Sequence, residues 1–149
     1  MNKSIEAPSK NGKIRRRFGV GLTLAGFLIF LLGASPNIFG LDRSNVIGFV
    51  QITVFLFGLG VICMSGLIIY QVSWSGIKKS IPAEIGLRLV ATGYVIALAS
   101  GMADVFGLGT RPLPNVPFFG YWQARGVLLG EMVIILGFVL MVPFVRRRQ

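Results

Sequence analysis

Four long apolar stretches, separated by short polar segments, set the main constraint on what this chain can fold into. The stretches lie at about 18–34, 46–72, 82–106 and 118–145. A helix that crosses a bilayer needs about 20 predominantly apolar residues, and these stretches meet or approach that length. Charged residues make up only 13% of the chain, roughly half their share in a soluble domain. We therefore expect an all-α integral membrane protein that folds as a four-transmembrane-helix bundle.

The basic residues predict how the helical domain, residues 18–145, is oriented. Residues 1–17 form a basic tail and residues 146–149 a basic C-terminus. With four spans, twelve of the fifteen Lys and Arg residues fall on one side, and three fall on the other, namely Arg43, Arg111 and Arg125. Cytoplasmic loops carry the excess of Lys and Arg, so both termini are expected in the cytoplasm. We expect an integral protein of a prokaryotic plasma membrane.

The net charge of +10 raises the question of what the chain binds. The basic residues flank apolar spans, and the chain has no separate basic domain that could carry a nucleic-acid-binding element. Lys and Arg next to a membrane span are typical of contact with anionic lipid headgroups. The expected partner is therefore the lipid bilayer and not nucleic acid.

The residue types that usually carry chemistry are scarce. The chain has no histidine, which removes the commonest general base and imidazole ligands for zinc and haem. Its single cysteine, Cys63, lies in an apolar stretch, which is typical of a small packing residue. The five acidic residues are scattered along the sequence: Glu6, Asp42, Glu84, Asp104 and Glu131. We predict no catalytic residue, no metal site and no cofactor, and we expect that the protein is not an enzyme.

Glu131 is the strongest pointer to function because it falls within the last apolar stretch. Ionisable residues at membrane depth are costly and usually mark an ion or proton pathway. We predict an intramembrane polar site formed by Glu131 with Gln51, Thr53 and Ser100. Two interpretations stay open: Glu131 is a proton or cation site, or it is a packing residue that is hydrogen-bonded to these neighbours.

A second pair of residues lies near the outer ends of the last two spans. Arg125 falls inside the fourth stretch, where an unpaired guanidinium is costly. Asp104 ends the third stretch, and a hairpin would bring the two helices side by side. We predict an ion pair between Asp104 and Arg125, with Arg111 as a competing partner. The alternative is that Arg125 extends outward past Tyr121.

The chain also matches itself when it is shifted by 72 residues without gaps. Between residues 16 and 62, ten residues then fall on identical residues of the second half, among them Gly21 on Gly93, Ala25 on Ala97, Gly48 on Gly120, Gln51 on Gln123 and Gly58 on Gly130. The match predicts two tandem helical hairpins, related by internal duplication and inserted in the same direction. The alternative is that any two membrane hairpins share Gly and Leu.

The remaining pattern concerns packing, because small residues recur at helical spacing in every span. In the fourth stretch Gly126 and Gly130 form a GxxxG pattern, and such faces let helices approach closely in lipid. We predict a small multi-pass membrane protein that acts as a non-catalytic subunit or accessory protein, associated with itself or with a larger membrane complex. The alternative is a small oligomeric transporter or channel that uses Glu131.

Overall fold

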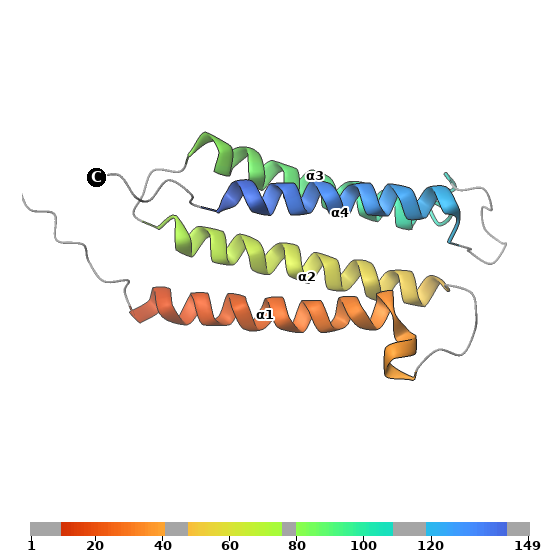
Figure 1. Ribbon diagram of the computed structural model, residues 1–149, viewed down its shortest axis with the longest axis horizontal. Coiled ribbons are helices and arrows are strands. Elements are labelled where there is room, and N and C mark those ends of the chain that lie inside the picture. The colour runs from red at the N-terminus through yellow and green to blue at the C-terminus, as the bar shows by residue number, and fades with distance from the viewer. Residues whose placement is uncertain (1–9, 41–47, 76–79, 109–118, 143–149) are drawn as a thin grey trace, which may run out of the picture.

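A computed structural model describes residues 10–40, 48–75, 80–108 and 119–142. Four helices make up the fold: α1 (Lys10–Ala34), α2 (Phe49–Ser73), α3 (Ile81–Gly101) and α4 (Tyr121–Met141). A short 3-10 helix, η1 (Pro36–Phe39), follows α1. Each of the four long helices is long and apolar enough to cross a membrane. The all-helical class and the number of candidate spans are confirmed (Figure 1).

The first helix starts earlier than the sequence predicts. The sequence predicts a basic tail that reaches residue 17, whereas α1 is already helical from Lys10. Lys and Arg have high helix propensities, so the basic segment can extend the apolar helix without a break. The basic residues from Lys13 to Arg17 are therefore held at fixed angles around a helix.

The third helix ends earlier than predicted, at Gly101 instead of about 106. The chain then turns back on itself: the Leu108 N–H donates to the Ala103 carbonyl oxygen at 2.8 Å, and Gly107 adopts a left-handed φ of 72°. The left-handed Gly107 ends the run of turns that follows α3, a conformation that glycine adopts without steric cost. Gly40 closes η1 in the same way, with a φ of 65°.

Helices α1 and α2 form a tight antiparallel hairpin. Gly19, Gly26 and Gly33 are buried and follow each other at seven-residue spacing along α1. A Cβ atom at Gly33 would collide with the backbone of Phe55, and one at Gly58 would collide with the backbone of Phe30. A seven-residue spacing keeps side chains on one side of a helix, so these glycines form one continuous contact line with α2.

Helices α3 and α4 form a second hairpin of the same kind. Gly86 and Gly93 on α3 lie seven residues apart, as do Gly130 and Gly137 on α4, and all four are buried. A Cβ atom at Gly86 would come within 2.5 Å of the Gly137 carbonyl oxygen. Close backbone approach through small residues is how helices associate in lipid, and it defines both hairpins here.

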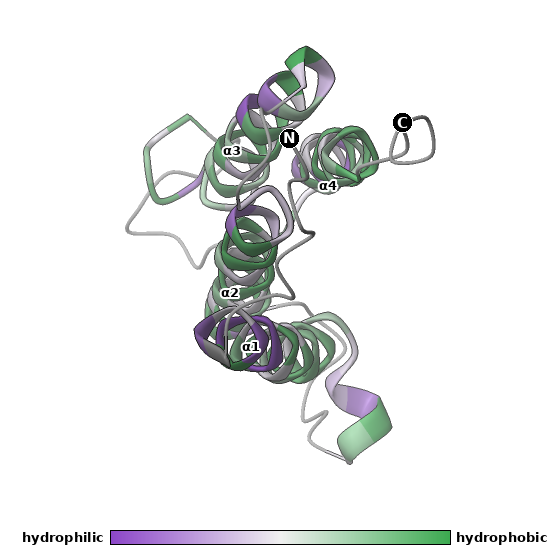
Figure 2. Cartoon of the chain, turned by 90° about the vertical axis from the view of Figure 1, so that its left-hand side faces the viewer, coloured by the Kyte–Doolittle hydropathy of each residue, from purple (hydrophilic) through white to green (hydrophobic). Residues whose placement is uncertain are grey.

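The two hairpins are joined mainly through α2 and α3, and α1 makes no extended contact with α4. Figure 2 shows the helices end-on as a curved row, from α1 through α2 to the α3–α4 pair. The Tyr94 hydroxyl donates to the Leu56 carbonyl oxygen at 3.4 Å, and Trp74 Nε1 donates to the Met141 carbonyl oxygen at 3.2 Å. The four helices therefore do not close into a compact bundle, and α1 and α4 each keep an open side.

Both hairpins run in the same direction, as the sequence match predicts, since α1 and α3 begin at the same end of the molecule (Figure 1). The gapless pairing of residues is wrong for the first helix of each hairpin, however. Gly21 is exposed, and a Cβ atom added there would meet no atom within 4 Å, whereas Gly93 is buried against Gly130. Ala25 is likewise exposed, whereas Ala97 is fully buried.

Candidate intramembrane polar site

Glu131 lies in a groove between α4 and the first hairpin. The groove has a volume of about 390 Å³, and Gln51 is its other polar side chain able to form strong hydrogen bonds. The remaining lining is apolar: Phe30, Gly33, Ala34, Ile52, Phe55, Phe119, Ala124, Val127 and Leu128. Three helices supply this lining, and the groove exists because α1 and α4 do not pack against each other.

The position of Glu131 along α4 places its carboxyl group far from either end of the span. It is the tenth residue after Tyr121, where α4 begins, which corresponds to about 15 Å along the axis. Helical side chains lean toward the N-terminus of their helix, so this carboxyl group leans toward the end at which α2 also begins. Gln51 is the third residue of α2. Glu131 and Gln51 therefore line the same groove, with Gln51 nearer the end at which α2 and α4 begin.

The other two residues of the predicted polar site lie elsewhere. Thr53 is exposed, and its hydroxyl donates to the Phe49 carbonyl oxygen of its own helix at 2.9 Å. Ser100 lies within the α3–α4 hairpin, where it packs against Gly126. Neither residue lines the groove, so the structure brings together two of the four predicted residues.

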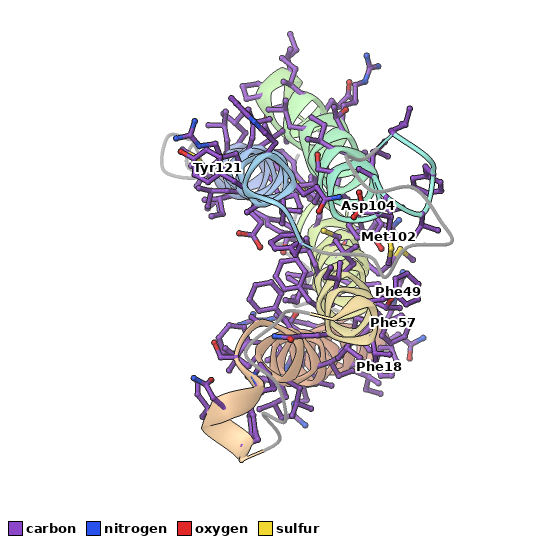
Figure 3. The ribbon with its side chains drawn as sticks, turned by 90° about the vertical axis from the view of Figure 1, so that its right-hand side faces the viewer. Phe18, Phe49, Phe57, Met102, Asp104 and Tyr121 are labelled. Atoms are coloured by element: carbon purple, nitrogen blue, oxygen red, sulfur yellow. The ribbon has the colours of Figure 1, made fainter. Side chains whose placement is uncertain are left out.

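The two residues of the predicted ion pair lie in different surroundings. The Arg125 guanidinium carbon lies 4.2 Å from the centre of the Tyr121 ring and 5.6 Å from the centre of the Trp122 ring. Arg125 is exposed, whereas Asp104 is only 4% exposed. Tyr121 and Asp104 lie on different sides of α4 in Figure 3. Arg125 thus takes the alternative orientation, toward the aromatic rings at the end of the span.

The sequence reasoning missed a polar contact inside the first hairpin. Thr23 Oγ1 and Ser65 Oγ are 2.8 Å apart, and Ser65 is fully buried. Each hydroxyl also lies within hydrogen-bond distance of a carbonyl oxygen of its own helix, Gly19 for Thr23 and Ile62 for Ser65. Two hydroxyl protons can satisfy only two of these three bonds at once. The available signal was that Ser65 and Gly58 lie seven residues apart on the side of α2 that faces α1.

Two further apolar grooves flank the row of helices. One, of about 470 Å³, lies toward the C-terminal ends of α2 and α4, and its lining includes Thr23, Tyr70 and Phe138. The other, of about 660 Å³, involves α1, α2 and α3 and includes Cys63 and Tyr94. Within residues 10–40, 48–75, 80–108 and 119–142, no three His, Cys, Asp or Glu residues gather where they could hold a metal ion.

No family model, no curated protein and no solved structure matches this chain.

Proposed function

We propose that this small multi-pass membrane protein is a non-catalytic subunit or accessory protein that works through contacts between helices. The observation that carries this proposal is the open row of helices. Large apolar side chains of the outer helices remain exposed, including Leu24 and Phe27 on α1 and Met132 and Ile135 on α4. The polar groups found within the spans are mostly engaged in packing, as Thr23 with Ser65 shows.

The distribution of acidic side chains supports a non-catalytic role. Glu84 lies in the first turn of α3, Asp104 follows the opposite end of that helix, and Glu131 lies in the middle of α4. Two carboxylates that work as a general acid and base pair, as in glycoside hydrolysis, must face one substrate from both sides. These three residues lie at different heights along the helices, so they do not face one common substrate. The chain also contains no histidine that could act as the second group of an acid–base pair.

The alternative function is transport of a proton or a small cation through Glu131. It is favoured by one observation, that Glu131 and Gln51 share a groove at membrane depth. Against it, the groove nearer the other end of α4 is lined mainly by apolar side chains, with Thr23, Ser73 and Tyr70 as its polar members. A conduction path would need polar groups at successive depths.

A flux assay on purified protein in liposomes separates the two functions. We expect wild-type protein and Glu131→Gln to show the same proton and sodium flux as empty liposomes. Thr53→Val serves as the control, because Thr53 is exposed and lies outside the groove. Flux that depends on wild-type protein and is lost in Glu131→Gln, but not in Thr53→Val, would replace the proposed function with transport.

We further propose that both termini lie in the cytoplasm of a prokaryotic cell and that anionic headgroups contact the basic segment of α1. The charge distribution supports this orientation, with twelve Lys and Arg residues on the side of the termini and three on the other. Single cysteines at Ser44 and Ser80, in a Cys63→Ala background, test it with a membrane-impermeant thiol reagent. Labelling of the Ser44→Cys variant from outside and of Ser80→Cys only from the cytoplasm is expected. The reverse pattern would overturn the orientation.

We also propose that the two hairpins descend from one duplicated hairpin whose second copy has a longer loop. A shift of 67 residues aligns α1 with α3 and places Gly19 on Gly86 and Gly26 on Gly93. Between residues 10 and 41 the same shift matches nine residues: Ile14, Gly19, Leu22, Gly26, Ile29, Leu31, Phe39, Gly40 and Leu41. It also places the left-handed Gly40 on the left-handed Gly107.

The second helices of the hairpins keep the shift of 72. Under it α2 and α4 begin at equivalent residues, each after a glycine in extended conformation, Gly48 and Gly120. Gly58 falls on Gly130, and both are buried in the contact with the preceding helix. A difference of five residues between the two shifts corresponds to one insertion between the helices of the second hairpin, and the closely packed residues of both hairpins then coincide.

A further inference from the structure

The contact between the hairpins uses different surfaces of each. On the first hairpin it uses α2, where Ile52 and Leu56 approach Gly101, and Gly60 approaches Tyr94. On the second it uses mainly α3, which carries Gly101 and Tyr94, while α4 meets α2 only near their ends, at Phe138 and Met141. If the two hairpins are equivalent units, each carries both contact surfaces, and their contact covers only one copy of each surface. The two uncovered surfaces can then make the same contact with further hairpins until a ring closes. The uncovered copies lie on α4 and on α1.

The face of α4 that corresponds to the contact face of α2 is apolar and open. By the shift of 72, Leu56 corresponds to Leu128 and Gly60 corresponds to Met132. Leu56 is 2% exposed, whereas Leu128 is 56% and Met132 is 64% exposed. The leucine that is buried on α2 is thus uncovered on α4.

The face of α1 that corresponds to the contact face of α3 is open in the same way. By the shift of 67, Tyr94 corresponds to Phe27 and Gly101 corresponds to Ala34. Phe27 is 49% exposed and Ala34 is also exposed. Phe27 keeps the aromatic ring of Tyr94 but lacks its hydroxyl.

We propose that a second copy of this chain places its α1 against α4, in the way that α3 lies against α2 within one chain. The proposal rests on the duplication proposed above and names this protein itself as the partner. The residue sizes match this arrangement. Gly60 leaves room for the Tyr94 hydroxyl, whereas the larger Met132 would face the smaller ring of Phe27, and methionine sulfur packs well against aromatic rings.

The same contact would change the surroundings of Glu131. By the shift of 72, Glu131 corresponds to Leu59, which is buried. A second copy on this face of α4 would therefore withdraw the carboxyl group from the lipid chains, where an ionisable group is costly. Because the contact joins two different surfaces, each copy keeps one surface for a further copy, and the assembly ends when the row closes on itself.

Disulfide cross-linking in proteoliposomes of the purified full chain tests this proposal. The variant Phe27→Cys/Met132→Cys, in a Cys63→Ala background, places one cysteine on each face. Since α1 makes no extended contact with α4 within one chain, the expected disulfide joins two copies, and a covalent dimer on a denaturing gel distinguishes it from a disulfide within one chain. Oxidation should convert at least half of the chain into covalent oligomers. The matched control is Ala25→Cys/Met132→Cys, because Ala25 is exposed at nearly the same depth as Phe27 but on the opposite side of α1.

The other outcomes overturn the proposal. Equal cross-linking of the control pair would indicate random collisions. Cross-linking of Met132→Cys alone would indicate a two-fold contact between two α4 helices, and a monomeric mass in lipid nanodiscs would indicate no self-association. None of these results depends on ion flux, so the proposed accessory function and the self-association can fail separately.

Discussion

Gly93 of α3 and Gly130 of α4 meet backbone to backbone, and the contact is reciprocal. A Cβ atom at either glycine would lie 2.6 Å from the carbonyl oxygen of the other. No side chain, however small, fits between the two helices at this level. The distance between α3 and α4 at this level is therefore set by their backbones, because each glycine has only a hydrogen atom where another residue has a side chain.

The substitution Gly130→Ala should destabilise the protein, because the added methyl group forces α3 and α4 apart. Overpacking of this kind costs about 1–3 kcal/mol. Gly21→Ala is the matched control, since Gly21 is exposed and a Cβ atom there meets nothing within 4 Å. In the control, the higher helix propensity of alanine should leave stability unchanged or raise it by up to about 1 kcal/mol. Unfolding in mixed micelles, followed by circular dichroism, measures both, and equal effects would contradict the packing described.

These glycines also show what the sequence could and could not predict. The number of helices follows from the length of the apolar stretches, because a bilayer fixes the length of a span. The gapless shift paired Gly21 with Gly93, and it failed because one loop is longer than the other. The seven-residue spacing of Gly19, Gly26 and Gly33 was visible in the sequence and identifies the packed side of α1 correctly.

The polar site was predicted in part for a similar reason. Depth along a helix can be counted from its ends, and that count placed Glu131 at the level of the membrane. The direction of a side chain around the helix depends on how the helix is rotated, which the sequence does not fix when all sides are apolar. Thr53 and Ser100 were therefore assigned to a site from which their helices turn them away.

Arg125 should be energetically coupled to Tyr121 and not to Asp104. Its guanidinium carbon lies 4.2 Å from the Tyr121 ring centre, and a cation–aromatic contact at an exposed site contributes about 0.5–1 kcal/mol. Double-mutant cycles on unfolding free energies should give a coupling of this size for Arg125→Gln with Tyr121→Leu. The effects of Arg125→Gln and Asp104→Asn should add to within about 0.5 kcal/mol. A larger coupling in the second cycle would restore the ion pair.

Trp74 should hold the ends of α2 and α4 together. Its indole N–H donates to the Met141 carbonyl oxygen at 3.2 Å, a hydrogen bond that joins the two hairpins. Trp74→Phe keeps an aromatic ring but removes the donor, and it should cost about 0.5–1.5 kcal/mol. Spin labels at Gln71 and Val142 should then show a broader distance distribution. Trp122→Phe is the control because Trp122 is 75% exposed, and it should leave that distribution unchanged.

The arginines at the basic start of α1 differ in their position around the helix, and we expect them to differ in their contribution to lipid binding. Lys13, Arg16 and Arg17 line one surface with Val20, at the spacing of neighbours on one helix face. Arg15 lies outside this surface, and its guanidinium donates to the Gln71 side chain on α2 at 3.5 Å.

Neutralising the surface group should therefore weaken binding to anionic lipid more than neutralising Arg15 does. A Lys or Arg near an anionic membrane surface contributes about 1 kcal/mol, so Arg16→Gln/Arg17→Gln should lower the apparent affinity for phosphatidylglycerol by about 30-fold. Arg15→Gln should lower it by no more than about 2-fold, well below the roughly 5-fold per charge expected for Arg16 and Arg17, since its guanidinium already bonds to Gln71. Titration of phosphatidylglycerol into protein in neutral detergent, read by native mass spectrometry, measures both. If the affinity falls by the same factor for each charge removed, wherever it lies on the helix, the headgroups respond to net charge and not to this surface.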